Sequence, residues 1–178
     1  MPRLFTGLEI PPDVAADLAL LRGGLPDARW IAPEDFHVTL RFIGDIDSAA
    51  AREVVSALDH LHCAPFDVSI DGLSSFGGRK PRALIATLSP DAALMETQAT
   101  QERLLRRLGL VPEGRKYTPH VTLARLRDTP RRAVAAYLSG RGVFHPLRFR
   151  VARFVLYSSR ASTGGGPYVV ERAYPLAA

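Results

Sequence analysis

A tetrapeptide that occurs twice constrains this chain of 178 residues more than any other feature of its sequence. The segment His-Val-Thr-Leu at residues 37–40 recurs at residues 120–123, which is 83 residues further along the chain. Because the chain has only five histidines, a chance repeat that begins with histidine at both places is rare. A repeat at this spacing indicates two related halves, each of which contributes one His-x-Thr segment.

Both copies of the repeat lie in segments whose residue pattern is typical of a β-strand. Side chains of a strand alternate between its two faces, so His37 and Thr39 share one face, as do His120 and Thr122. The Val and Leu of each copy then point the other way, into the core of each half. If the halves face each other, two imidazoles and two hydroxyls meet in one cleft.

This combination of groups suits displacement at a phosphodiester. Two imidazoles can divide acid and base catalysis near neutral pH, with one ring protonated and the other neutral. Threonine hydroxyls can donate hydrogen bonds to the non-bridging phosphate oxygens. The alternative is that each histidine merely packs in a duplicated strand, and the shared threonine position disfavours that interpretation.

The apolar periodicity predicts an α+β chain with roughly seven strands and three or four helices. Short connections and the mixed order of the elements favour a largely antiparallel sheet. A helix is expected to begin at residue 48, with Ser48 as its N-cap, and loops are expected at 74–81 and 158–166. The predicted strands are 3–9, 36–43, 66–73, 82–88, 120–125, 145–158 and 167–174, and the predicted helices are 12–21, 48–61, 91–108 and 131–138.

The positive charge of the chain comes almost entirely from arginine. Lys and Arg number 23 against 18 Asp and Glu, and only Lys80 and Lys116 are lysines. Because the planar guanidinium binds phosphate through two parallel hydrogen bonds, one interpretation is a polyanionic partner such as RNA. The other is a G+C-rich coding sequence, which favours Arg, Ala, Gly and Pro alike.

Several classes of protein are disfavoured by the sequence. No apolar run approaches the roughly 18 residues of a membrane helix, and Gly7 and Glu9 come too early for a signal peptide, so a cytoplasmic protein is expected. The single cysteine, Cys63, excludes an internal disulfide and a multi-cysteine zinc site, and we expect no metal and no cofactor. The chain lacks the P-loop motif and K-x-D-G, which argues against an ATP-dependent ligase.

At these residues the sequence resembles the 2H phosphoesterase superfamily, which is named for its two His-x-Thr/Ser motifs. More narrowly, it is similar to the bacterial and archaeal RNA 2′,3′-cyclic phosphodiesterases, also called 2′-5′ RNA ligases. The segment Trp-Ile-Ala-Pro-Glu-Asp-Phe-His-Val-Thr-Leu-Arg-Phe-Ile-Gly at 30–44 is similar to the first block of that family, and Pro-His-Val-Thr-Leu-Ala-Arg at 119–125 to the second. Further similarity lies at 76–83, 156–159, 166–168 and 174–176, so the resemblance covers essentially the whole chain.

The resemblance implies a single bilobed domain over residues 1–178, with a central cleft between pseudosymmetric lobes of mainly antiparallel sheet and helices outside. It implies metal-independent hydrolysis of an RNA terminal 2′,3′-cyclic phosphate to a 2′-phosphomonoester. In that scheme His37 protonates the departing 3′-oxygen and His120 deprotonates the attacking water, while Thr39, Thr122 and Arg125 bind the phosphate. A reversible 2′-5′ ligation, which joins a cyclic phosphate end to a 5′-hydroxyl, is also implied as possible. RNA with such an end is the implied partner, with no membrane and no obligatory protein partner.

Strand alternation makes different predictions for the two arginines near the repeats. Arg41 lies four residues after His37, so alternation places it on the catalytic face, as a second candidate for phosphate binding or as a solvated arginine at the rim. Arg125 lies five residues after His120, on the opposite face of a regular strand. It would reach the cleft through a bulge, the end of the strand or its long side chain.

Three further alternatives remain open. Phe76, in the expected loop 74–81, could stack on a base of the RNA, or the loop could be plain surface. The substrate could instead be a cyclic dinucleotide, a 2′-5′ oligoadenylate or an ADP-ribose cyclic phosphate. The protein could also bind RNA ends without catalysis, although a pure binder needs no acid–base pair.

Overall fold

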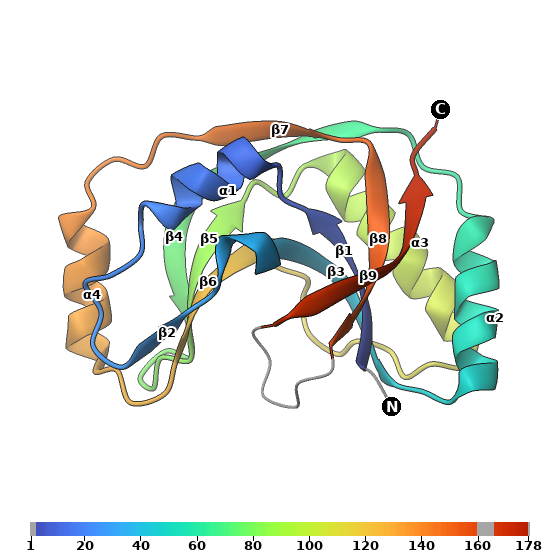
Figure 1. The fold of residues 1–178 in the computed structure, drawn as a ribbon, viewed down its shortest axis with the longest axis horizontal. Helices are drawn as coiled ribbons and strands as arrows, with labels where there is room; N and C mark the ends of the chain where they lie inside the picture. The colour runs from blue at the N-terminus through green and yellow to red at the C-terminus, as the bar shows by residue number, and fades with distance from the viewer. Residues whose placement is uncertain (1–2, 160–165, 178) are drawn as a thin grey trace.

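The computed structural model describes residues 3–159 and 166–177 of the chain. Its elements follow one another as strands and helices in a repeated order (Figure 1). The strands are β1 (Arg3–Glu9), β2 (Ala28–Trp30), β3 (His37–Asp45), β4 (Phe66–Phe76), β5 (Ala83–Leu88), β6 (His120–Leu126), β7 (Leu147–Val151), β8 (Arg153–Ser159) and β9 (Tyr168–Pro175). The helices are α1 (Pro12–Ala19), α2 (Ser48–Asp59), α3 (Ala92–Arg107) and α4 (Arg131–Gly140), with a short 3-10 helix η1 (Pro33–Asp35).

These elements agree with the predicted ones to within a few residues, with four differences. Strand β2 and helix η1 were not predicted, because three residues are too few to show a period. Strand β4 extends to Phe76, into the expected loop 74–81, and the expected strand 145–158 is divided into β7 and β8. The N-cap of α2 is Asp47 rather than Ser48, since the Asp47 carboxylate accepts the N–H of Ala50 at 2.8 Å. Most of the expected loop 158–166 lies outside the described residues.

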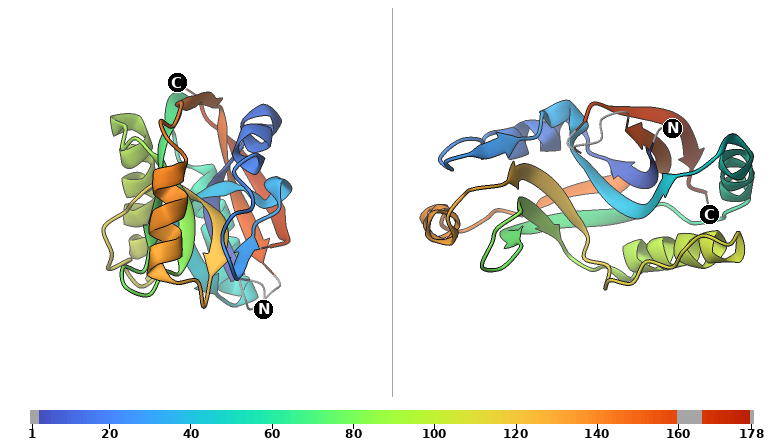
Figure 2. Two further views of the ribbon diagram at one scale, coloured as in Figure 1. Left: turned by 90° about the vertical axis from the view of Figure 1, so that its left-hand side faces the viewer. Right: turned by 90° about the horizontal axis from the view of Figure 1, so that it is seen from below.

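The described strands form one antiparallel sheet in the order β7-β4-β5-β6-β3-β1-β8-β9, with β2 paired to the side of β6. Four strands therefore lie on each side of the central contact between β6 and β3. That contact is narrow, because Val38 and Val121 are its only paired residues. Seen from below, the strands around β1 and β9 form one layer and those around β4 and β5 form the other (Figure 2).

The period of 83 residues extends well beyond the tetrapeptide. Helices α2 and α4 begin at Ser48 and Arg131, and strands β4 and β8 end at Phe76 and Ser159, so both pairs keep the spacing of 83 residues. Each repeat also sends its last strand into the other half of the sheet: β4 follows β3 and α2 but pairs with β5, while β8 follows β6 and α4 but pairs with β1. The two halves of the sheet are therefore interlocked, and neither is a continuous half of the chain.

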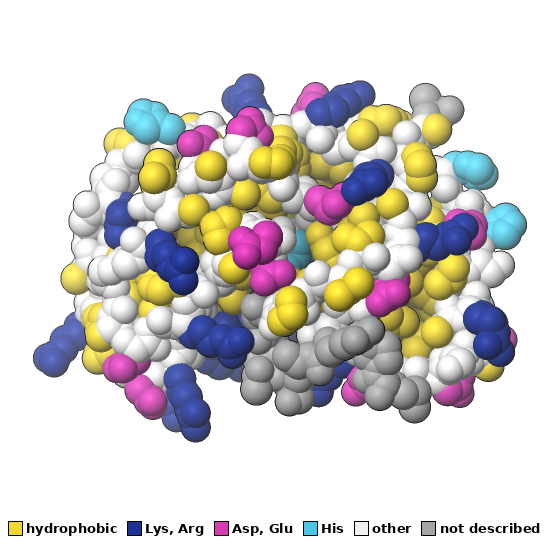
Figure 3. Space-filling model, in the orientation of Figure 1, with side chains coloured by type: hydrophobic (Ala, Val, Ile, Leu, Met, Phe, Trp, Pro, Cys, Tyr) yellow, Lys and Arg dark blue, Asp and Glu magenta, His cyan; other side chains and the backbone are white. Residues whose placement is uncertain are grey.

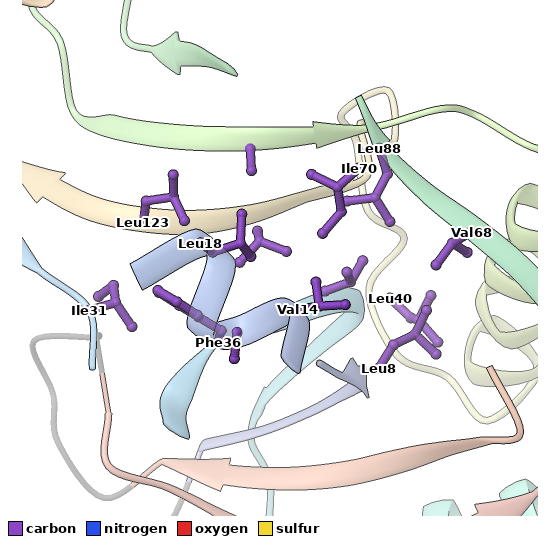
Figure 4. Close-up of a cluster of buried hydrophobic side chains, with 14 of the residues drawn as sticks. Leu8, Val14, Leu18, Ile31, Phe36, Leu40, Val68, Ile70, Leu88 and Leu123 are labelled. Carbon is purple, nitrogen blue, oxygen red and sulfur yellow. The ribbon is translucent and has the colours of Figure 1, made fainter. Parts of the chain in front are cut away.

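One apolar cluster joins the two halves. Leu40 and Leu123, the last residues of the two tetrapeptides, both lie in it and are almost completely buried, as the alternation predicts (Figure 4). Helix α1 packs beside η1 and β7, α3 beside β3 and β4, and α4 beside β4. In the part of the chain that the structure describes, no helix is long and apolar enough to cross a membrane.

Candidate active site

The two His-x-Thr segments meet at the centre of the sheet. Because Val38 pairs with Val121, each valine lies at the β3–β6 contact between the histidine and the threonine of its own motif. Both valines are completely buried, and the histidines and threonines beside them are partly exposed on the opposite face. The structure therefore brings the two motifs together about a pseudo-twofold axis.

Each motif strand contains a bulge at the same place. In the pairing of β1 with β3 the register steps past Leu40, and in the pairing of β5 with β6 it steps past Leu123. Both residues are the fourth of their tetrapeptide. A bulge inserts one extra residue and so reverses the alternation of faces for the residues that follow it.

The bulge at Leu123 explains how Arg125 reaches the cleft. Arg125 lies five positions after His120, which is the opposite face of a regular strand, and the extra bulge residue returns the arginine to the face that carries the histidine. Arg125 and His120 accordingly line the same cavity. The sequence left three routes open for Arg125 to reach the cleft: a bulge, the end of the strand or its long side chain. The structure contains the bulge.

The bulge at Leu40 moves Arg41 off the catalytic face, so the alternation argument that placed it there is wrong. The Arg41 side chain is only 6% exposed, and its guanidinium pairs with the Glu102 carboxylate of α3 and donates to the backbone carbonyls of Phe42 and Val111. It borders the larger cavity, but its three nitrogens are engaged by the protein. Contacts within the protein therefore take the place of the phosphate contact expected of Arg41.

The same bulge identifies a residue that the sequence reasoning missed. At the spacing of 83 residues, Arg41 corresponds to the buried Ala124, and Phe42 corresponds to Arg125. Phe42 is 45% exposed and borders both cavities of the site. The repeat itself was the signal for Phe42, because Phe42 and Arg125 each lie two residues beyond their tetrapeptide.

His37 is held by hydrogen bonds on both ring nitrogens. Its Nδ1 lies 2.9 Å from the carbonyl of Asp35, and because a carbonyl can only accept, this nitrogen carries a proton. Its Nε2 lies 3.1 Å from the hydroxyl of Thr39. In the neutral ring Nε2 has a lone pair, so the Thr39 hydroxyl donates to it.

Aromatic rings surround His37. The ring centroids of Phe5, Tyr157 and Tyr168 lie 5.1, 5.4 and 4.8 Å from that of the imidazole. The Asp35 carboxylate accepts the backbone N–H of Tyr168 at 3.2 Å, which holds that ring beside the histidine.

Burial has a large effect on the titration of His37. It lowers the pKa of this imidazole from 6.5 to about 4, because the charged form loses its hydration. The hydrogen bond to Asp35 opposes this shift, while the positive charges of His120 and Arg125 add to it. In the absence of ligand, His37 is therefore neutral at pH 7.

His120 is held in a similar way but is less enclosed. Its Nδ1 donates to the carbonyl of Thr118 at 2.7 Å, which leaves Nε2 as the basic nitrogen of the neutral ring. Phe76, at the end of β4, meets the imidazole edge to face, with ring centroids 4.7 Å apart. Burial lowers the pKa of His120, and the charge of Arg125 lowers it further, although the Thr118 hydrogen bond opposes both.

The site opens into two adjoining cavities that share Thr39 and Phe42. The larger has a volume of about 690 Å³ and carries His120 among basic residues, and the smaller has about 110 Å³ and carries His37 among aromatic ones. A histidine is visible in the hollow near the centre of the face in Figure 3. The basic residues of the larger cavity are Arg41, Arg82, Arg115, Lys116 and Arg125.

Thr122 lies in the second motif, and Tyr117 contacts the first. Thr122 is half-buried and shares its face of β6 with His120, but it does not border either cavity. Tyr117 donates its hydroxyl to the carbonyl of Thr39 at 2.8 Å, which ties the loop before β6 to β3 beside its bulge. Within residues 3–159 and 166–177, no three His, Cys, Asp or Glu side chains are grouped as metal ligands would be.

Comparison with known proteins assigns the chain to a family. The model of the LigT-like phosphoesterases matches residues 8–86 and again residues 87–168, once for each repeat. The RNA 2′,3′-cyclic phosphodiesterase of Aquifex aeolicus is 31% identical over 152 residues, which are 82% of this chain and 81% of that protein. The protein of that name from Bacillus subtilis is 28% identical over 130 residues, or 70% of this chain and 71% of the relative.

Solved structures share the fold over nearly the full length. The protein TT0787 of Thermus thermophilus superposes with a TM-score of 0.79 at 22% identity and covers 98% of this chain and 97% of its own. Escherichia coli LigT in complex with 3′-AMP superposes with a TM-score of 0.78 at 21% identity and covers 99% of both chains. The bilobed α+β fold expected from the resemblance is thus confirmed. With one family match on each repeat, this chain belongs to the LigT-like phosphoesterases.

Proposed function

We propose that this protein is an RNA 2′,3′-cyclic phosphodiesterase that hydrolyses a terminal cyclic phosphate to a 2′-phosphomonoester. The observation that carries the proposal is the meeting of His37 and His120 about the pseudo-twofold axis, with Arg125 close enough to influence the titration of both. Relatives of the chain carry the name of this activity. In this proposal residues 1–178 act as one bilobed domain. The protein acts in the cytoplasm, where it would meet its RNA substrate.

The two imidazoles divide the proton transfers of the reaction. The Nε2 of His120 accepts a proton from a water molecule as the water oxygen forms a bond to phosphorus. The bond from phosphorus to the 3′-oxygen breaks, and the Nε2 of His37 donates its proton to that oxygen. His120 ends protonated and His37 neutral, and exchange with solvent restores the starting state. With an RNA 5′-hydroxyl in place of water as the nucleophile, the same proton transfers would give a 2′-5′ linkage.

Substrate binding prepares His37 for its role as the acid. A protonated Nε2 cannot accept a hydrogen bond, so protonation of His37 frees the hydroxyl of Thr39 to donate to the phosphate instead. The negative charge of the phosphodiester in turn raises the pKa of the imidazole. Arg125 and Thr122 complete the phosphate contacts in this scheme, with the guanidinium binding the phosphate through charge-assisted hydrogen bonds.

The first test is product analysis on an RNA oligonucleotide with a 2′,3′-cyclic phosphate end, incubated with the protein in the presence of EDTA. We expect full conversion to the 2′-phosphomonoester, identified by phosphorus NMR. Binding without conversion would favour an RNA-end-binding protein and refute the proposed activity. Turnover of a cyclic dinucleotide, 2′-5′ oligoadenylate or ADP-ribose cyclic phosphate, but not of the RNA, would assign a different substrate.

The pH dependence of kcat/KM should be bell-shaped, with its maximum on the acid side of pH 6.5. The reaction needs one proton on the pair of imidazoles, and both pKa values are lowered from 6.5 in the free protein, that of His37 to about 4. The rate constant therefore falls at higher pH as this proton is lost and at lower pH as a second proton binds. Initial rates between about pH 4 and 9 measure the profile, and a maximum above neutrality would contradict it.

A further inference from the structure

Arg29 lies directly opposite Arg125 in the sheet. Strand β2 pairs with β6 through Ala28 with Leu126, Arg29 with Arg125 and Trp30 with Ala124. Directly opposed residues of an antiparallel pair share a face, with their Cβ atoms about 4.5–5.5 Å apart. Arg29 therefore lies on the same face of the sheet as the arginine that lines the larger cavity.

Among the described residues, no carboxylate forms an ion pair with either of these like charges. Opposed like charges destabilise a strand pair. Neither Arg29 nor Arg125 is part of an ion pair among the residues that the structure describes, and both are exposed. Ala28 and Trp30, the neighbours of Arg29 in β2, pack against the apolar core and set which way the strand faces. Two cations are thus presented side by side, and an anion between them would relieve their repulsion.

The basic surface continues across β6. The carbonyl of Arg82 accepts the N–H of Leu126 at 2.9 Å, and Arg82 lines the larger cavity with Arg125. The other basic residues of the cavity differ, because Arg115 and Lys116 share their loop with Glu113, which also borders the cavity. Arg82 and Arg125 border the cavity and Arg29 lies next to Arg125 just beyond it, so these three arginines offer the more uniform positive charge for a polyanion.

We propose that Arg29 binds the phosphate on the 5′ side of the terminal nucleoside and makes the site selective for oligonucleotides over a nucleoside 2′,3′-cyclic phosphate. The inference rests on the proposed function, which places the cyclic phosphate at His37, His120 and Arg125. An RNA that ends in a cyclic phosphate continues from the site only in the 5′ direction, so its next phosphate passes along the wall of the cleft. Arg29 is the cation directly opposite Arg125, on the neighbouring strand β2.

The test compares kcat/KM for a trinucleotide with a 2′,3′-cyclic phosphate end and for the corresponding nucleoside 2′,3′-cyclic phosphate. In Arg29→Ala, the ratio of the two values should fall about tenfold, as expected for loss of one charge-assisted hydrogen bond. The slope of log(kcat/KM) for the trinucleotide against the logarithm of the salt concentration should become less steep, by about the contribution of one phosphate contact. Arg148→Ala is the matched control, since Arg148 is an exposed arginine on the edge strand β7, which β4 and β5 separate from β6, and its loss should leave the ratio unchanged.

A neutral methylphosphonate at the linkage 5′ to the terminal nucleoside completes a cycle with the variant. If Arg29 binds that phosphate, the modified trinucleotide should react equally well with the wild type and with Arg29→Ala. An unchanged ratio in Arg29→Ala would overturn the inference. An arginine that merely protects a sheet edge from aggregation would also leave the ratio unchanged.

Binding of the trinucleotide, measured by fluorescence anisotropy, separates this inference from the proposed function. If the wild type hydrolyses neither substrate, the proposed function fails, but the dissociation constants still test Arg29. Weaker binding by Arg29→Ala than by the wild type and Arg148→Ala would support the phosphate contact. Equal dissociation constants for all three proteins would refute it.

Discussion

Replacement of His120 by alanine is expected to lower kcat by about three orders of magnitude, because a positioned general base contributes on the order of 10²–10⁴ to such a reaction. His37→Ala should have an effect of similar size through loss of the general acid. His120 is partly exposed and makes a single hydrogen bond through its ring, so its replacement should leave the fold intact. Single-turnover rates on the cyclic phosphate RNA, with circular dichroism of each variant, measure both expectations.

The control for these variants is His62→Ala, which removes an exposed histidine outside the site and should leave kcat unchanged. In the double variant both His37 and His120 are replaced. It should be only slightly slower than the slower of the two single variants, because the two residues act as a unit. Full activity in either single variant, measured with EDTA present, would contradict the proposed roles.

The second large effect concerns stability. Glu102→Ala should lower the free energy of unfolding by about 3–5 kcal/mol, because it leaves the buried guanidinium of Arg41 without its counter-charge. The two side chains are only 6% and 17% exposed, so water compensates little of the loss. The other carboxylate oxygen of Glu102 accepts the N–H of Glu113 at 3.1 Å, which also ties the loop of the larger cavity to α3. Urea denaturation of the variant measures the change.

Glu96→Ala provides the matched comparison on the same helix. Glu96 pairs with Arg103 at the surface, and an exposed ion pair contributes little to stability. A loss in Glu102→Ala no greater than that in Glu96→Ala would mean that Arg41 does not depend on its partner. That outcome would reopen the question of whether its guanidinium is available to substrate.

Much of the fold and the pair of catalytic candidates could be predicted from residue patterns alone. The repeat identified His37 and His120, and alternation correctly assigned the buried and exposed residues of each tetrapeptide. The regular helices and strands also appeared near their predicted positions, since each is long enough for its apolar period to be recognised. The short strand β2 could not be recognised in this way, although it carries Arg29.

The arginines illustrate why the remainder could not be predicted. Arg41 and Arg125 were assigned to faces on the assumption of regular strands, and the bulges at Leu40 and Leu123 changed both assignments. A bulge forms where the register of a strand with its neighbour changes, and the neighbour of each motif strand is distant in sequence. The same holds for β4 and β8, whose residues indicate a strand but do not indicate that each pairs in the opposite half.

The amino-acid sequence by itself thus determined the local elements, the duplicated motif and the two histidines, because these depend on periodicities within a single segment. Only the tertiary structure decided that Val38 meets Val121, that Arg125 shares the face of His120 while Arg41 is buried against Glu102, and that Arg29 lies beside Arg125. These relations depend on which strands pair and in what register, and pairing is set by packing across the whole sheet.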